Sequence, residues 1–189
     1  MTRRRWGVFL DRDGTLLRLV PYLSDPGRAH LYRGAAEALR QLKEAGARLV
    51  VVTNQSGVAR GYFTRRDVDR VNARMRARLA ADGVRLDAVE VCPHLAEVTG
   101  PCDCRKPAPG MILRAARRLG IDLKASWTIG DNESDLLAAR AAGTRAALVR
   151  TGYGRLTEKT RAGRSVDVAG NNLGVVVRRI LAARAGKGA

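Results

Sequence analysis

Short apolar runs alternate with segments of helical periodicity along the chain. Leu49–Val52 is apolar throughout, which is typical of a strand buried on both faces of a parallel sheet. Ala35, Ala38, Leu39 and Leu42 fall at positions i, i+3, i+4 and i+7, as on the buried face of a helix. This alternation predicts a doubly wound α/β sheet. The predicted strands are Trp6–Leu10, Leu49–Thr53, Ala88–Val91, Trp127–Ile129 and Ala146–Val149, and the predicted helices are Ala35–Ala45, Arg65–Ala81, Ile112–Leu119, Asp135–Ala142 and a closing helix through Leu173–Leu181.

Two carboxylates follow the first predicted strand. Asp11 and Asp13 come directly after Val8–Leu10, at the carboxyl edge where open α/β sheets place their active sites. Residues two apart on an extended chain point to the same side, and two acids in one pocket repel each other unless a cation joins them. Oxygen ligands of this kind favour Mg²⁺. The alternative is that Asp13-Gly14 is only a turn signal.

Two further polar clusters follow predicted strands. Thr53–Gly57 follows the second strand, where its hydroxyls and backbone N–H groups could cradle an anion or form only a helix cap and turn. Gly130–Asp135 follows another strand and brings more carboxylates to the same edge. The return of acids and phosphate-binding groups to three strand ends favours one site over three unrelated turns.

All three cysteines lie in one segment together with a histidine. Cys92-Pro-His94 and Cys102-Asp-Cys104 offer three thiolates and one imidazole, which is a typical ligand set for structural zinc. A disulfide is disfavoured, because we expect a reducing compartment and because Cys102 and Cys104 are too close for easy bridging. Three buried cysteines with an uninvolved histidine are the remaining alternative. Since the segment has little apolar content, zinc would supply its folding energy.

Basic residues outnumber acidic ones by 35 to 18, which gives a net charge of +17. Such a charge suggests a nucleic-acid partner, but the arginines are spread along predicted helices and aromatic residues are only 4%. Charged helix faces exposed to solvent, or a positive electrostatic field that attracts anionic substrates, explain the charge better.

Arg105 and Lys106 directly follow Cys104 and could contact phosphate groups or simply face solvent. With no apolar run near the ~20 residues of a membrane helix, and no secretion signal, we expect a cytoplasmic protein.

Together these motifs resemble the haloacid dehalogenase superfamily of aspartate-dependent phosphatases. Asp11-x-Asp13-Gly-Thr, Thr53-Asn-Gln-Ser, Lys106 and Gly130-Asp131 with Asp135 occur in the family's order over nearly the whole chain. The resemblance implies one domain over residues 1–189, with a Rossmann-like, doubly wound parallel sheet. Only one helix and one strand fit between the first two motifs. We therefore expect a capless α/β fold with a zinc-stapled loop.

The resemblance also implies an aspartyl-phosphate mechanism that needs Mg²⁺. Asp11 would attack phosphorus, and Asp13 would protonate the leaving oxygen and then activate water. The backbone carbonyl of Asp13 would bind the metal beside Asp11 and Asp131, and Asp135 would support it through water. The implied catalytic residues are Asp11, Asp13, Thr53 and Lys106; the substrate contacts are Asn54, Gln55, Ser56, Arg105 and Asn132; and the metal ligands are Asp11, Asp13 and Asp131 for Mg²⁺ and Cys92, His94, Cys102 and Cys104 for Zn²⁺.

Within the superfamily, the chain is similar to the heptose bisphosphate and histidinol-phosphate phosphatases. Thr53–Gly61 and Lys106–Met111 favour the heptose branch, which implies removal of the C7 phosphate of D-glycero-D-manno-heptose 1,7-bisphosphate. The short zinc loop leans toward the histidinol branch. A nucleic-acid 3′-phosphatase and a non-enzymatic zinc-stapled module are further alternatives. As partner we expect a small sugar phosphate, neither a membrane nor a nucleic acid, and we expect a monomer.

Overall fold

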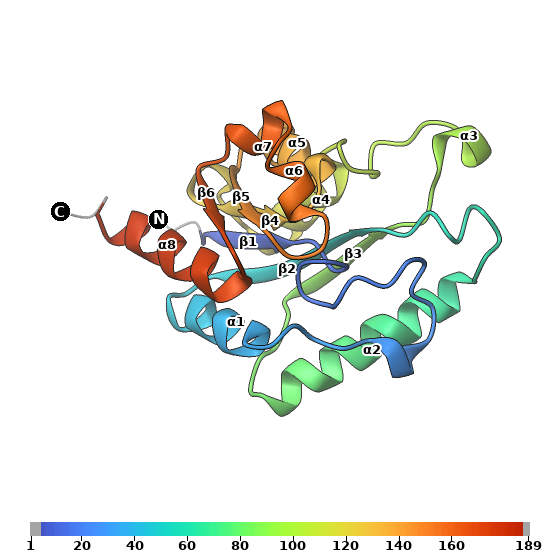
Figure 1. Ribbon diagram of the computed structural model, residues 1–189, viewed down its shortest axis with the longest axis horizontal. Coiled ribbons are helices and arrows are strands. Elements are labelled where there is room, and N and C mark those ends of the chain that lie inside the picture. Colours follow the sequence, from blue (N-terminus) through green and yellow to red (C-terminus); the bar gives the residue numbers. More distant parts are fainter. Residues whose placement is uncertain (1–4, 187–189) are drawn as a thin grey trace.

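A six-stranded parallel sheet forms the centre of the computed structural model, which describes residues 5–186. The strand order is β3-β2-β1-β4-β5-β6, so β1 lies between β2 and β4 (Figure 1). This order is that of a doubly wound sheet, which confirms the predicted fold class. The strands are β1 (Gly7–Leu10), β2 (Arg48–Asn54), β3 (Ala88–Cys92), β4 (Trp127–Gly130), β5 (Arg145–Val149) and β6 (Val168–Gly170).

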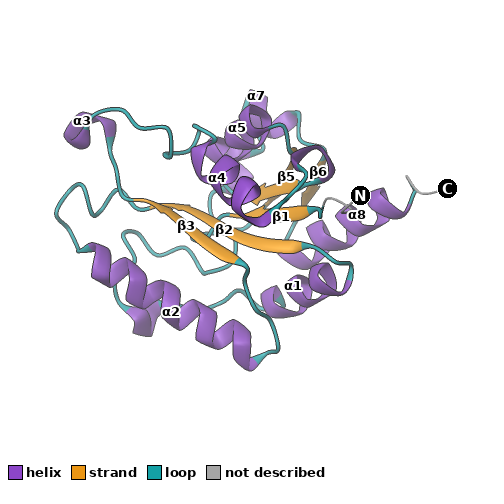
Figure 2. Cartoon of the chain, turned by 180° about the vertical axis from the view of Figure 1, so that it is seen from behind, coloured by secondary structure: helices purple, strands orange, loops and turns teal. Residues whose placement is uncertain are grey.

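Helices cover both faces of the sheet (Figure 2). Val8 and Leu10 pack in one apolar cluster with α1, α2 and α8, whereas Phe9 packs in a second cluster on the other face with α4 and α5. Since successive strand residues point to opposite faces, the uninterrupted apolar strands are explained by burial on both sides. The helices are α1 (Ala35–Glu44), α2 (Arg65–Ala81), α3 (Ala96–Thr99), α4 (Gly110–Leu119), α5 (Glu133–Ala142), α6 (Gly154–Thr157), α7 (Arg161–Arg164) and α8 (Leu173–Ala185).

Capping residues set where several of these helices begin. At α2, Thr64 and Asp67 form a reciprocal capping box, which satisfies backbone donors of the first turn. Asn132 and Asp135 form a second capping box, and for this reason α5 begins at Glu133, two residues before the predicted start.

The sequence pattern missed the shortest elements, because three or four residues are too few to show a period. They are β6, α3, α6, α7 and two 3₁₀ turns at Pro26–Arg28 and Leu123–Ala125.

The carboxyl ends of the strands open onto a surface that no inserted domain covers. Residues 11–34, between β1 and α1, contain a 3₁₀ turn at Pro26–Arg28, other turns and isolated β-bridges, but no strand of the sheet and no α-helix. Residues 55–64, between β2 and α2, contain no helix or strand. The capless architecture is therefore confirmed for residues 5–186. Across the same range, we find no helix with the length and apolar character needed to cross a membrane.

Candidate active site

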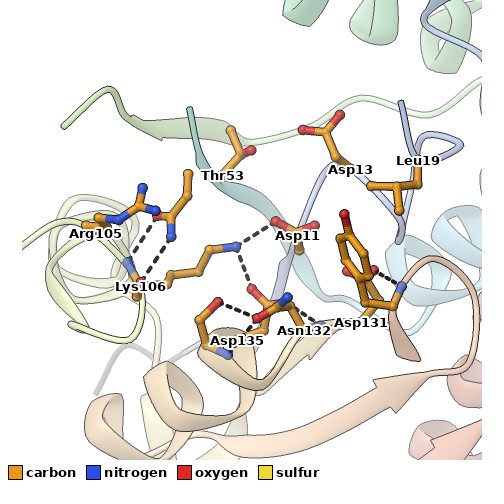
Figure 3. A pocket seen from close by; sticks show the side chains of 12 residues that line it. Asp11, Asp13, Leu19, Thr53, Arg105, Lys106, Asp131, Asn132 and Asp135 are labelled. Atoms are coloured by element: carbon orange, nitrogen blue, oxygen red, sulfur yellow. Dashed lines mark hydrogen bonds and ion pairs between the residues drawn. The ribbon is translucent and has the colours of Figure 1, made fainter. Parts of the chain in front are cut away.

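A buried lysine joins two aspartates at the carboxyl edge of the sheet. The Nζ atom of Lys106 donates to Asp11 Oδ1 at 2.6 Å, to Asp135 Oδ1 at 2.5 Å and to the carbonyl of Val52 at 2.9 Å. Asp11 follows β1, Asp135 lies in the first turn of α5, and Lys106 comes from the loop before α4 (Figure 3). Three segments far apart in the sequence are thus held together by one ammonium group.

Burial shifts the pKa values of the charged groups in this cluster. It raises the pKa of Asp11 well above its ordinary value; Lys106 acts in the opposite direction, and the nearby carboxylates raise that pKa further. Burial alone would lower the pKa of Lys106, but the charges of Asp11 and Asp135 outweigh it and raise that pKa. Lys106 therefore stays charged and compensates the charge of the carboxylates around it.

Asp131 adds a third buried carboxylate and is held by the loop after β5. The N–H of Tyr153 donates to Asp131 Oδ2 at 2.7 Å. A Cβ atom on Gly14 or on Gly152 would lie 2.2 or 2.0 Å from that oxygen, and both glycines have positive φ. Only glycine allows these two loops to close on the carboxylate. Burial, followed by the charge of Asp135, raises the pKa of Asp131 to about 7.

The three carboxylates fit a divalent cation. Oxygens of Asp11, Asp131 and Asp135 lie within 4.8 Å of one another, and burial together with their mutual repulsion raises the pKa values of Asp11 and Asp131. Hard oxygen donors at this density suit Mg²⁺. The side chain of Asp13 lies outside this group and points away from Asp11 (Figure 3). Contrary to what their spacing predicted, the two side chains therefore do not point to the same side, because the chain turns after β1. That Asp13 would bind a metal through its backbone carbonyl stays a prediction.

The polar residues after β2 hold the site together. Asn54 uses both ends of its amide on the backbone of Lys106, accepting from its N–H and donating to its carbonyl, each at 3.0 Å. Gln55 Nε2 donates to Asp13 Oδ2 at 2.9 Å and to Thr53 Oγ1 at 2.8 Å. Gln55 is buried. Its Nε2 is thus engaged by the protein, and the expected contact of Gln55 with substrate stays a prediction.

Two adjoining hollows open above the strand ends. The first, the catalytic hollow, has a volume of about 250 Å³. It is lined by Asp11, Asp13, Leu19, Thr53, Asn54, Arg105, Lys106, Asp131, Asn132, Ser134, Asp135 and Tyr153. The second, the side hollow, has about 270 Å³ and shares Asp13, Leu19, Asn54 and Tyr153 with the first. Its other lining residues are Val20, Pro21, Tyr22, Leu23, Gln55, Ser56, Gly57 and Phe63.

All the residues expected to catalyse, to bind Mg²⁺ or to contact substrate line one of these hollows. Ser56 and Gln55 line only the side hollow, and the others line the catalytic hollow. The sequence motifs did not indicate Tyr153, whereas Leu19 lies in the segment Leu17–Asp25, which we expected from the sequence to border an open site. The position of Arg150–Gly154 directly after a predicted strand was the signal that could have pointed to Tyr153.

The cysteine and histidine side chains converge on one point beside the site. The Sγ atom of Cys104 lies 3.0 Å from that of Cys92 and 3.5 Å from that of Cys102, and His94 Nδ1 lies 3.2 Å from Cys104. These separations are too long for a disulfide, and all three cysteines are free. The four ligand atoms lie within 4.8 Å of one another, which is compatible with a tetrahedral zinc ion.

Arg105 links this cysteine–histidine cluster to the catalytic hollow. Its Nη1 donates to the carbonyl of His94 at 3.2 Å, and its side chain lines the hollow. Lys106 is the next residue, two positions after Cys104. The folding of the cysteine segment therefore determines where both basic groups lie.

The chain is similar to known protein families and to curated proteins. Residues 8–68 match the model of the haloacid dehalogenase-like hydrolase family, and residues 103–174 match the HAD-hydrolase-like model. A D-glycero-beta-D-manno-heptose-1,7-bisphosphate 7-phosphatase of Yersinia pestis is 45% identical over 159 residues, which cover 80% of this chain and 84% of that protein. The chain belongs to the haloacid dehalogenase-like hydrolases. The enzyme of the same name from Escherichia coli K12, another hydrolase, is 45% identical over 152 residues, covering 77% and 79% of the two chains.

Solved structures of haloacid dehalogenase-like hydrolases have the same architecture. The D,D-heptose 1,7-bisphosphate phosphatase of B. bronchiseptica, in complex with magnesium and phosphate, has a TM-score of 0.86 and 34% identity. The match covers 94% of this chain and 99% of that one. The D,D-heptose 1,7-bisphosphate phosphatase of Burkholderia thailandensis has a TM-score of 0.69 and 30% identity, with coverage of 94% and 99%.

Proposed function

We propose that the protein is a Mg²⁺-dependent phosphatase that removes the C7 phosphate of D-glycero-D-manno-heptose 1,7-bisphosphate through an aspartyl-phosphate intermediate. The observation that carries the proposal is the buried Asp11–Lys106–Asp135 contact, whose three residues line the catalytic hollow. The relatives at 45% identity are named for this substrate.

The side chains in the catalytic hollow support the following roles. Asp11 attacks phosphorus, and Lys106 stabilises the oxygens of the transferring group. Asp13 gives a proton to the leaving sugar oxygen and later takes one from the attacking water. Thr53, whose hydroxyl accepts from Gln55, is oriented to donate to a phosphoryl oxygen. Mg²⁺, held by Asp11, the Asp13 carbonyl and Asp131 with support from Asp135, would offset the negative charge of the phosphoryl group.

Arg105 is the residue that we expect to select a bisphosphate. The side hollow has no Lys or Arg among its lining residues. A second phosphate of the substrate would therefore pair with the guanidinium of Arg105, which lines the catalytic hollow. The guanidinium is tethered to His94 at 3.2 Å and retains donors for an anion. Zinc at the cysteine–histidine cluster would keep this loop folded. Because every residue invoked comes from one chain, a monomer would be active.

Histidinol phosphate is the second candidate, and one observation favours it. The side hollow contains the carboxylate of Asp13 and the rings of Tyr22 and Phe63, surroundings that suit a cationic imidazole and amine better than a phosphate. The short metal loop of the sequence points the same way.

Phosphate release from the two substrates, measured side by side with purified protein and Mg²⁺, tests the proposal. Arg105→Gln should raise the KM for the bisphosphate about 10- to 100-fold, the equivalent of one charge-assisted hydrogen bond. The KM for histidinol phosphate should change little. Arg117→Gln removes the same charge from an exposed position on α4 and is the control. A preference for histidinol phosphate would overturn the heptose assignment.

If both small substrates are inert, DNA with a 3′-phosphate is the next substrate to test. Binding through the +17 net charge would weaken steeply with salt, because phosphate contacts release counterions. An absence of duplex binding at low salt would exclude this alternative.

A further inference from the structure

Arg12 is a fully buried cation beside the proposed acid–base residue. Its side chain is 0% exposed. Nη1 donates to Asn72 Oδ1 at 2.9 Å, and Asn72 is itself buried on α2. On the other side, Nε and Nη2 lie 3.1 and 2.9 Å from Asp13 Oδ2. A buried guanidinium needs a counter-charge, and among residues 5–186 the only carboxylate that forms an ion pair with Arg12 is that of Asp13.

The carboxylate of Asp13 is held through one oxygen only. Oδ2 accepts from Arg12 and, at 2.9 Å, from Gln55 Nε2. Oδ1 is buried and has no hydrogen-bond partner. An unpaired buried acceptor is costly and rare in folded proteins, which makes it a candidate for a functional contact. The two oxygens of this side chain therefore have different surroundings.

Arg12 acts from outside the two hollows. It lines neither of them, so it does not contact a substrate placed there. Its link to α2 through Asn72 joins the Asp13 loop to a helix of 17 residues. The position of the acid–base carboxylate is thus set by a long, capped element and not by the loop alone.

We propose that Arg12, oriented by Asn72, is a positioning residue for acid–base catalysis by Asp13. It anchors Oδ2 and leaves Oδ1 to carry the proton. In the first step the Asp13 proton passes to the ester oxygen as the P–O bond breaks and the bond from Asp11 to phosphorus forms. In the second step Asp13 takes a proton from water, which attacks phosphorus and releases Asp11. This inference rests on the proposed function.

Leaving-group dependence separates positioning from a general structural role. With an alkyl phosphate such as glycerol 2-phosphate, Arg12→Met should lower kcat at least about tenfold, since general acid–base catalysis contributes about 10²- to 10⁴-fold. The KM should stay within about twofold because Arg12 is outside the hollows. With p-nitrophenyl phosphate, the leaving group needs no proton, so a burst of one nitrophenolate per enzyme should precede slow turnover.

Two further variants allow for a folding defect in Arg12→Met. Asn72→Ala keeps the charge but frees the guanidinium, and it should show the same pattern more weakly. Arg12→Lys should recover part of the kcat. Arg74→Met, an exposed arginine of α2, is the control and should match wild type. Folding of each variant is verified by its unfolding curve, and Asn72→Ala decides the outcome if Arg12→Met does not fold.

Three results would overturn the proposal. They are an unchanged kcat in folded variants, a rise in KM alone, and equal losses on both substrates without a burst. The assay uses any alkyl phosphate that wild type hydrolyses, so inactivity on heptose bisphosphate alone would refute only the substrate assignment. If wild type hydrolyses no phosphate ester at all, both proposals fail.

Discussion

Replacing Lys106 by methionine tests whether one ammonium group holds the site together. The side chains of Lys106, Asp11 and Asp135 are only 3%, 10% and 1% exposed. Methionine fills a similar volume but leaves the two carboxylates without their shared cation. Breaking a buried ion pair in this way costs about 3–5 kcal/mol. For a chain of 189 residues, with about 2–4 °C per kcal/mol, the melting temperature should fall by about 6–20 °C.

The assay is thermal unfolding in Mg²⁺-free buffer without a strong chelator, so that any zinc stays in place. Lys124→Met, at an exposed lysine, is the control and should change stability by less than about 0.5 kcal/mol. Added Mg²⁺ should recover part of the loss in Lys106→Met, because the cation takes over the compensating charge. Turnover should nevertheless stay low, because the phosphoryl oxygens have lost a donor.

The pH dependence of the same variant has a definite sign. Burial already raises the pKa of Asp11, so its contribution to stability is complete below its ordinary pKa and is lost as the pH rises through the raised value. Removing Lys106 raises that pKa further. The deficit of Lys106→Met should therefore be larger at pH 7.5 than at pH 5.5. Equal stability of variant and wild type at pH 7.5 would refute the electrostatic reasoning.

Three other predictions follow from contacts described above or from the hydrogen bonds at Asp87. Asp11→Asn should reduce kcat at least about 10⁴-fold, as expected for loss of a nucleophile, and a native unfolding curve with retained turnover would remove Asp11 from that role. Stripping metal from the cysteine–histidine cluster, or changing Cys104→Ser, should lower both melting temperature and activity; an unchanged melting curve in zinc-free protein would contradict a structural zinc. Asp87→Ala should lower the free energy of unfolding, measured with denaturant at pH 7, by about 1–3 kcal/mol. Burial acts to raise the pKa of Asp87. Hydrogen bonds from Lys43, the Leu49 N–H and Arg48 outweigh this effect and lower that pKa. This contribution should disappear in acid as Asp87 protonates, and a variant as stable as wild type at pH 7 would exclude it.

Most of the sheet could be predicted from the sequence because its strands are buried on both faces. Leu49–Val52 shows this, since its residues alternate between the two apolar clusters. The strand order could not be read from the pattern. The pairing of Val8 with Trp127 depends on contacts between distant segments, and no local periodicity encodes it.

The convergence of acids and basic residues was predictable, but the direction of individual side chains was not. Asp11 and Asp131 follow strands, and parallel strand ends share one edge. The amide of Gln55 could point into the side hollow or toward Asp13, and only the packed structure places it on Asp13. The N–H of Tyr153 on Asp131 is a backbone contact, which leaves no trace in residue type.

The central position of β1 has a consequence for synthesis of the chain. The N–H of Gly7 donates to the hydroxyl of Ser126, 119 residues later, and Asp11 N–H donates to the carbonyl of Ile129 at 2.9 Å. Until the ribosome has translated the codons of β4, β1 can pair only with β2, and its other edge stays open. Such non-local pairing is slow to form and leaves apolar surface exposed meanwhile. Asp11 can meet Asp131 only after residues 12–130, which separate them, have been translated.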